Sequence, residues 1–500
     1  MTLSAAFNII SSSFAANAAQ TAVVSNNVAN ANTSGYSHEI ANVVTNSYGG
    51  ADVASVTRVA NAALTEQAAA STAEAATQQA ISDGLATLAA TVDDSASASS
   101  SSGATQNGAS PSAMLANLQS ALTTYADSPT SSSAADAVVT AASQLAASLN
   151  RGAAAVAQVR EKADQDMASS VAAINSLLNQ FTAANNAVVT GLATGADVAS
   201  AEDQRDSLVS QLSQQIGVTT TTAADGSMSI YTDSGVTLFE DTPRAVSFTP
   251  TATLVDGASG SPVIVDGVPI TGSSSPMPIQ SGALAGYAAL RDTLAPQYES
   301  QLDQIAAGLI DAFAESDQSA TPTLPSLPGL FTTPGATSLP SMSATTGLAA
   351  AIAVNPNVDP AQGGDATRLR DGGISSPGNA AYTYNSTGAA SFTGRLRQLV
   401  GAITSTQSFD PSAGLGASAS LTDYANASVS WLQAENQQAS NASAYQSALA
   451  TQATSALSNA TGVNLDAEMT NMLSLENSYT ATAKLLTTVD SMLSALLAAA

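Results

Sequence analysis

The chain has 500 residues and a mass of 49.4 kDa, with 12 Lys and Arg, 38 Asp and Glu, one histidine and no cysteine. The resulting net charge of −26 argues against a nucleic-acid binder, which needs clustered basic side chains. The missing cysteines exclude disulfides and thiol chemistry, and a lone His38 predicts no zinc site, so we expect no metal and no cofactor.

The first segment, residues 1–50, is expected to be a coiled-coil helix that ends near Asn30, followed by a loop. Residues 1–37 carry no Lys, Arg, Asp or Glu, so the basic start of a signal peptide is missing, and if the chain leaves the cell we expect a pathway without a cleaved signal. Uncharged flanks favour packing between subunits over packing within one chain alone. The expected seam residues, with Asn17 setting the register, are Leu3, Phe7, Ile10, Phe14, Asn17, Val24 and Val28.

Residues 51–216 are expected to form the first part of a helical domain. Its helical patterns run from Val53 to Val92, from about Ala134 to Leu192 and from Asp203 to Gln215, with a flexible Ser-rich stretch at 95–108. A helical pattern as long as the second one indicates a bundle or a rod.

At Gly217 the apolar period changes from 3.6 to 2, which predicts a small antiparallel β domain over 217–280. Helical patterns return from Ser281 to Glu315 and from Leu421 to Leu457, within the second and third parts of the helical domain, 281–318 and 396–460. Between them, 319–395 is a Pro- and Gly-rich irregular segment, with a place in an outer domain as one option.

Residues 461–500 repeat the heptad pattern of the first segment. The expected fold is therefore mainly α, an elongated rod with coiled-coil helices at both termini, a central helical bundle and an inserted β domain. The termini are expected to pair at one end and the β domain to protrude at the other. The expected C-terminal seam residues are Leu465, Met472, Leu475, Tyr479, Leu486, Val489, Leu493 and Leu496.

No catalytic motif is found, and the sequence predicts that the chain is not an enzyme. His38 lies in a loop, where an ordinary structural role is favoured over catalysis. Arg205 is expected to pair locally with its acidic neighbours. Three pairs of carboxylates are interpreted as solvated helix surface or helix caps: Asp93 and Asp94, Asp164 and Asp166, Asp203 and Asp206.

Motifs in three parts of the chain resemble those of bacterial flagellar axial proteins. The N-terminal motif contains Asn26, Asn27, Asn30, Gly35 and Tyr36, and the C-terminal one runs through 462–469 and 479–484. A central motif, Asp203, Gln204, Arg205 and Asp206, followed by 225–231, narrows the resemblance to the hook-associated protein 1 family (FlgK).

This resemblance implies a structural adaptor that joins the flagellar hook to the filament. It also implies a ring or tube of identical subunits, exported unfolded by the flagellar type III system, outside the cell and without membrane insertion. The implied partners are further copies of the chain, the hook protein, the second junction protein and an export chaperone at the C-terminal helix. The alternatives are another axial component, such as hook protein or second junction protein, or more distantly an adhesin or surface enzyme with a carbohydrate-binding β domain.

Overall fold

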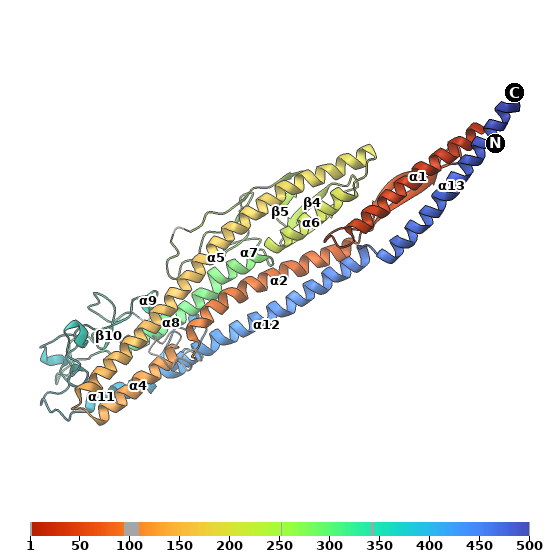
Figure 1. Cartoon of the computed structure of the whole chain (residues 1–500). Coiled ribbons are helices and arrows are strands. Elements are labelled where there is room, and N and C mark those ends of the chain that lie inside the picture. Colours follow the sequence, from red (N-terminus) through yellow and green to blue (C-terminus); the bar gives the residue numbers. More distant parts are fainter. Residues whose placement is uncertain (1–2, 95–109, 252, 342–344, 500) are drawn as a thin grey trace.

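The computed structural model describes residues 3–94, 110–251, 253–341 and 345–499, and it confirms a mainly helical fold, with 61% of the chain in helices. The molecule is an elongated rod whose two termini lie together at one end (Figure 1). The Ser-rich stretch 95–108 lies outside the described residues, as does the side chain of Leu3. None of the described helices is long and apolar enough to cross a membrane.

The terminal end of the rod is built from two antiparallel helices and a hairpin: α1 (Leu3–Asn30), α13 (Leu465–Ala499), β1 (Glu39–Thr45) and β2 (Ala51–Arg58). The hairpin replaces the predicted loop up to Gly50 and the predicted start of a helix at Val53. Its turn is closed by the Asn46 side chain, which accepts hydrogen bonds from the backbone N–H groups of Tyr48 and Gly50, with Gly49 at φ +84°.

The body of the rod is formed by long helices that lie nearly parallel to its axis. The longest, α5, has 63 residues and is therefore about 95 Å long. Its N-terminus is capped by the Ser131 hydroxyl, which accepts from the Ala134 N–H, and Gly195 ends it at φ +72°. The body helices are α2 (Ala62–Ala89), η1 (Ala90–Val92), α4 (Pro111–Asp127), α5 (Ser132–Thr194), α6 (Ala199–Gln215), α7 (Ala283–Ala289), η2 (Leu290–Leu294), α8 (Ala295–Ala312) and α12 (Leu421–Thr461).

The predicted β domain is present as two small antiparallel sheets, ordered β3-β4-β5-β6 and β7-β8-β9. They lie beside the second half of α5, on the side of the terminal helices, and not at the opposite end of the rod (Figure 1). The strands are β3 (Val218–Thr222), β4 (Met228–Thr232), β5 (Thr237–Glu240), β6 (Thr242–Pro243), β7 (Val246–Ser247), β8 (Ile264–Val265) and β9 (Val268–Pro269).

The end of the rod far from the termini is occupied by the Pro- and Gly-rich segment instead. Its short elements pack on the first half of α5 and on α8, through buried side chains such as Phe331 and Ile352. The elements of this segment are β10 (Phe331–Thr332), α9 (Leu348–Ala351), β11 (Ala353–Val354), η3 (Pro360–Gln362), α10 (Arg368–Asp371) and η4 (Ala380–Tyr382). The stretch predicted as the third part of the helical domain begins with α11 (Gly394–Thr404), β12 (Thr406–Ser408), η5 (Pro411–Ala413) and β13 (Ser418–Ser420) before α12.

Two hydrophobic cores hold the body together, and both use α5. The first half of α5, with Leu145 and Leu149 buried, packs with α4, α8, α11 and α12. The second half packs on the sheets, where the Phe181 and Phe239 rings meet edge to face at 4.9 Å. Among the described residues, neither core includes a side chain of α1, the hairpin or α13.

Candidate functional site

The contact between α1 and α13 combines an aromatic pair with a polar pair. Phe14 and Tyr479 stack edge to face with their ring centroids 5.0 Å apart. One turn further along, the Asn17 Nδ2 donates to the Ser478 hydroxyl over 3.1 Å. This hydrogen bond fixes the alignment of the two helices, because sliding one helix along the other would leave the buried Asn17 amide without a partner.

The predicted seam residues differ widely in burial. Ile10, Asn17 and Val24 are buried, whereas Phe7 is 54% exposed and Leu493 is 42% exposed. The rest divide into a partly buried group, Phe14, Val28, Met472, Leu475, Leu486 and Val489, and an exposed group, Leu465, Tyr479 and Leu496. Burial is therefore greatest along α1 between Ile10 and Val24, and it is low at both ends of α13.

A second face of α1, which the heptad pattern does not reveal, packs on the hairpin. Ala16 and Val23 are buried although neither belongs to the seam, and the Ile9 side chain lies beside Gly49 in the hairpin turn. The hairpin therefore holds one side of α1 while α13 covers another.

Exposed apolar side chains are concentrated at this end of the molecule. Of the 18 large hydrophobic side chains that are exposed in the described part of the chain, 14 lie in α1, the hairpin or α13. Such a concentration is typical of a protein interaction surface. These 14 are Phe7, Ile40, Val43, Val44, Tyr48, Leu465, Met469, Leu473, Tyr479, Leu485, Met492, Leu493, Leu496 and Leu497.

A polar joint connects this terminal unit to the body. Arg58, the last residue of β2, donates from its Nε to Glu202, from Nη1 to Asp203 at 2.9 Å and from Nη2 to Asp206 at 2.6 Å. The second oxygen of Asp203 accepts from the Ser37 N–H at 2.9 Å. One arginine thus holds three carboxylates of α6, and the central motif fastens the hairpin to the helical body.

The N-terminal motif residues close the other side of the joint. The Asn27 amide accepts from the Tyr36 hydroxyl at 2.9 Å and from the Glu39 N–H at 3.0 Å, and it donates to Glu468 at the start of α13 over 3.2 Å. His38 meets the other Glu468 oxygen at 3.0 Å. The chain's only histidine therefore links the two terminal segments.

The electrostatics of the joint follow from burial and from its excess of carboxylates. Burial raises the pKa of Glu39, and the nearby charges of Asp197 and Asp203 raise it further. Burial, with Glu39 and Asp203 close by, also raises the pKa of the Tyr36 hydroxyl well above its usual value. Burial alone would lower the pKa of Arg58, but its three carboxylate partners outweigh that effect and raise it.

Several local predictions about the motif residues are wrong. Arg205 is buried, yet its Nη1 donates to the Gly226 carbonyl and to the Asn185 amide, whereas Asp203 and Asp206 bind Arg58. Asp203 is itself 9% exposed, so it is not solvated helix surface.

The remaining motif residues have lesser roles in the joint. Gln204 and Asn26 are exposed, Asn30 donates back to the Asn26 carbonyl, and Gly35 supplies a turn at φ +81°.

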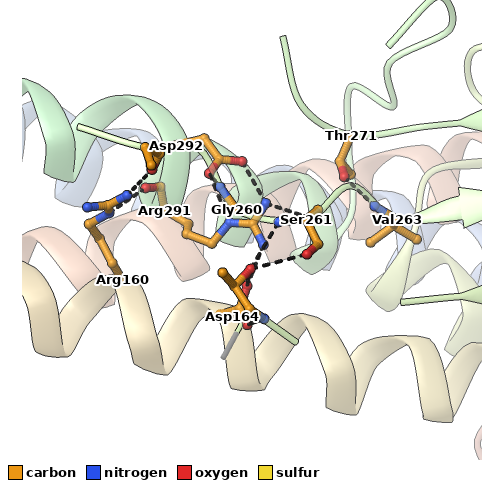
Figure 2. Close-up of polar contacts among 10 residues, drawn as sticks. Arg160, Asp164, Gly260, Ser261, Val263, Thr271, Arg291 and Asp292 are labelled. Atoms are coloured by element: carbon orange, nitrogen blue, oxygen red, sulfur yellow. Dashed lines mark hydrogen bonds and ion pairs between the residues drawn. The ribbon is translucent and has the colours of Figure 1, made fainter. Parts of the chain in front are cut away.

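Asp164 is also a buried anchor and not the solvated residue that the sequence predicts. It accepts from Arg291 and from the Thr251 N–H, at 3% exposure (Figure 2). Arg291 also binds Asp292 and the Ser261 carbonyl, and it is fully buried. This cluster fastens the segment before β8 to α5 and η2.

The described side chains do not form a group of three or more His, Cys, Asp or Glu able to hold a metal ion. Three carboxylates of the joint, Glu202, Asp203 and Asp206, are each bound by Arg58. What the geometry offers is therefore a surface for macromolecular packing and a rigid joint behind it.

Comparison with known families matches three separate parts of the chain. A model of the flagella basal body rod protein matches residues 7–36, and one of the flagellar basal body rod FlgEFG protein C-terminal region matches 455–499. The model of the flagellar hook-associated protein FlgK helical domain matches residues 104–322. The chain carries the helical domain of the FlgK family. That family consists of structural flagellar proteins, as the resemblance implied, and these matches give no support to an adhesin or a surface enzyme.

Among solved structures, the flagellar hook junction protein FlgK from Burkholderia pseudomallei is similar, at 22% identity and a TM-score of 0.40. The match covers 54% of this chain and 46% of that chain, so the two correspond over about half of the solved protein. No curated protein sequence matches the chain.

The family matches fall on the parts of the chain that meet at the joint. Asn27 and Tyr36 lie in the rod-protein match, Asp203 and Asp206 in the FlgK helical domain, and Glu468 in the C-terminal match. Sequence motifs found these residues but not their partner Arg58, which stands outside all three matches.

Proposed function

We propose that this protein is the structural adaptor between the flagellar hook and the filament, where copies of it form a tubular ring. The observation that carries this proposal is the exposed apolar surface of the terminal helix pair and hairpin, set at one end of a rod with two complete cores of its own. Burying that surface between copies removes apolar area from water, worth about 25 cal/mol per Å².

In this arrangement the terminal unit, residues 1–50 and 461–500 in the predicted division, forms the inner layer of the tube. The body, made of 51–216, 281–318 and 396–460, forms outer layers together with the β segment 217–280. The irregular segment 319–395 at the far end of the rod belongs with those outer layers. Because the joint fixes the hairpin to α6, packing of the terminal helices also sets where each body stands.

The proposed partners are the hook protein on one side of the ring and the second junction protein on the other. Before secretion, the apolar face of α13 is the proposed binding site of an export chaperone, which would shield it from aggregation. The proposed location is outside the cell, after export of the unfolded chain by the flagellar type III system. A chain without cysteine cannot form disulfide cross-links on the way.

Another axial protein, the hook protein or the second junction protein, is the alternative closest to this proposal. The two terminal matches fit any rod-like axial component, whereas the match over 104–322 is to the helical domain of FlgK and supports the junction role.

Electron microscopy of a strain that lacks the protein tests the proposal. We expect bare hooks, with filament protein released into the medium, and restoration of filaments by the intact gene. Normal filaments in the deletion strain would exclude the junction role. Missing hooks would instead favour a rod or hook component.

A further inference from the structure

The terminal helix pair carries two apolar features at different places. At its free tip, Phe7 of α1 and Leu486, Val489 and Leu493 of α13 line a groove of about 620 Å³, the tip groove. At its base, Leu465, Met469 and Leu473 form an exposed ridge, the base ridge, at 44%, 51% and 59% exposure. The ridge residues are spaced by four, so they follow one row along the helix.

One helix pair cannot fill its own groove. Met469 and Val489 are separated by roughly 30 Å along a continuous helix, at about 1.5 Å per residue. Groove against groove between two copies would leave the cavity unfilled, whereas a row of side chains fits between two helices as ridges fit grooves. The complementary shapes therefore belong to different copies.

One pair of charges on α13 fits this pairing, and Asp490 is the one charged residue in the groove lining. Helix α1 has no charged side chain, and among the described residues Lys484 is the only basic one in the helix pair, with no ion pair. On α13, Asp466 lies one turn before the ridge residue Met469. Lys484 lies one turn before Thr487, which lines the groove, so the two spacings are the same. A parallel copy whose Met469 enters the groove therefore brings its Asp466 beside Lys484.

We propose that copies of this chain join head to tail, with the base ridge of one α13 seated in the tip groove of the next copy. The proposal rests on the proposed function, because a ring between two different structures needs all copies to point the same way. An antiparallel pair exchanging ridge and groove would close into a dimer and bury both features. A parallel contact stays open and continues along the assembly.

Engineered cysteines distinguish these arrangements, because the natural chain has none. The variant Met469→Cys with Thr487→Cys is oxidised in isolated flagella and run on a non-reducing gel. The two positions lie too far apart on one helix to bond within a chain. We expect a ladder of multimers from the double variant and none from either single variant. A dimer without higher bands, or no cross-link in assembled flagella, would overturn the proposal.

Charge reversal provides a second readout that does not depend on oxidation. Lys484→Glu places like charges together at the contact, and we expect about tenfold fewer filaments per cell. Adding Asp466→Lys should restore them, and Lys162→Glu, at an exposed lysine of the body, should have no effect. Full filament numbers in Lys484→Glu, or no rescue by the second change, would contradict the contact. Normal filaments in the strain that lacks the protein would instead contradict the proposed function.

Discussion

The terminal helix pair and the body differ in how completely each is packed. In the body, α5 is covered by two cores and its buried charges, Asp164 and Arg160, meet partners on other elements. In the terminal pair, α1 and α13 share a narrow seam and leave leucines, methionines and aromatic rings exposed. The body has complete hydrophobic cores of its own, whereas the terminal pair needs contacts with neighbouring molecules to bury its apolar side chains.

The largest loss of stability is expected when the buried cluster around Arg291 and Asp164 in the body is disrupted. Replacing Arg291 by Ala leaves Asp164 buried without its partner, which should reduce the free energy of unfolding by about 3 to 5 kcal/mol. Urea unfolding of the monomer measures it. Lys162→Ala, at an exposed site, serves as the control and should change stability by less than about 0.5 kcal/mol. If Arg291→Ala lowers the free energy of unfolding no more than Lys162→Ala does, the cluster does not stabilise the body.

A smaller effect is expected at the joint. Arg58→Ala removes the partner of Asp203 and two further carboxylates, so we expect a loss of about 2 kcal/mol and faster proteolysis between residues 31 and 61. Arg58→Lys keeps the charge but not the three-way geometry and should give an intermediate result. Unchanged proteolysis in both variants would mean that the terminal unit is held by other contacts.

The body should also lose stability as pH rises. Burial, followed by hydrogen bonding from Asp256, raises the pKa of Glu299 from 4.5 to about 8. Between these values the folded chain binds a proton that the unfolded chain releases, so the free energy of unfolding falls as pH increases. From about pH 6.5 to about pH 8.5 we expect a loss of about 1 kcal/mol after solvent screening. Denaturant midpoints should show this slope in the natural chain and a weaker one in Glu299→Gln; equal slopes would contradict it.

The smallest effect on monomer stability is expected at the tip. Phe7 is 54% exposed, so Phe7→Ala should change the free energy of unfolding by less than about 0.5 kcal/mol. The same change should impair filament formation, because Phe7 lines the tip groove. Thr488→Ala, at an exposed position nearby, is the control for both measurements. A large loss of monomer stability in Phe7→Ala would place the side chain in a core rather than at an interface.

The helices could be predicted from the sequence because their apolar periods are long and their caps are local. Ser131 and Gly195 mark the ends of α5 by short-range chemistry. The hairpin was harder to predict although Ile, Val and Thr are common in its strands, because a register shift between Asn42 and Val43 interrupts the alternation and two valines follow each other. Val43 and Val44 before the Asn46 turn, with Gly49 and Gly50 after it, were the available signal.

The joint shows where sequence reasoning about the site ends. Motifs identified Asn27, Tyr36 and Asp203, but the partner of Asp203 is Arg58, 145 residues earlier in the chain. Pairing at that separation depends on how the body folds back past the hairpin, which no local pattern records. The prediction of where the two sheets lie was wrong for the same reason, since the apolar periodicity of the strands does not say which half of α5 they cover.

Hydrogen exchange of the monomer and of the assembled ring, compared peptide by peptide, tests the central claim most directly. We expect α5 amides between Val138 and Ile174 to be protected in both states. Amides of α1 and of α13 beyond Tyr479 should exchange rapidly in the monomer and become protected only on assembly. Equal protection of α1, α13 and α5 in the monomer would contradict the account, because the terminal pair would then be complete without its neighbours.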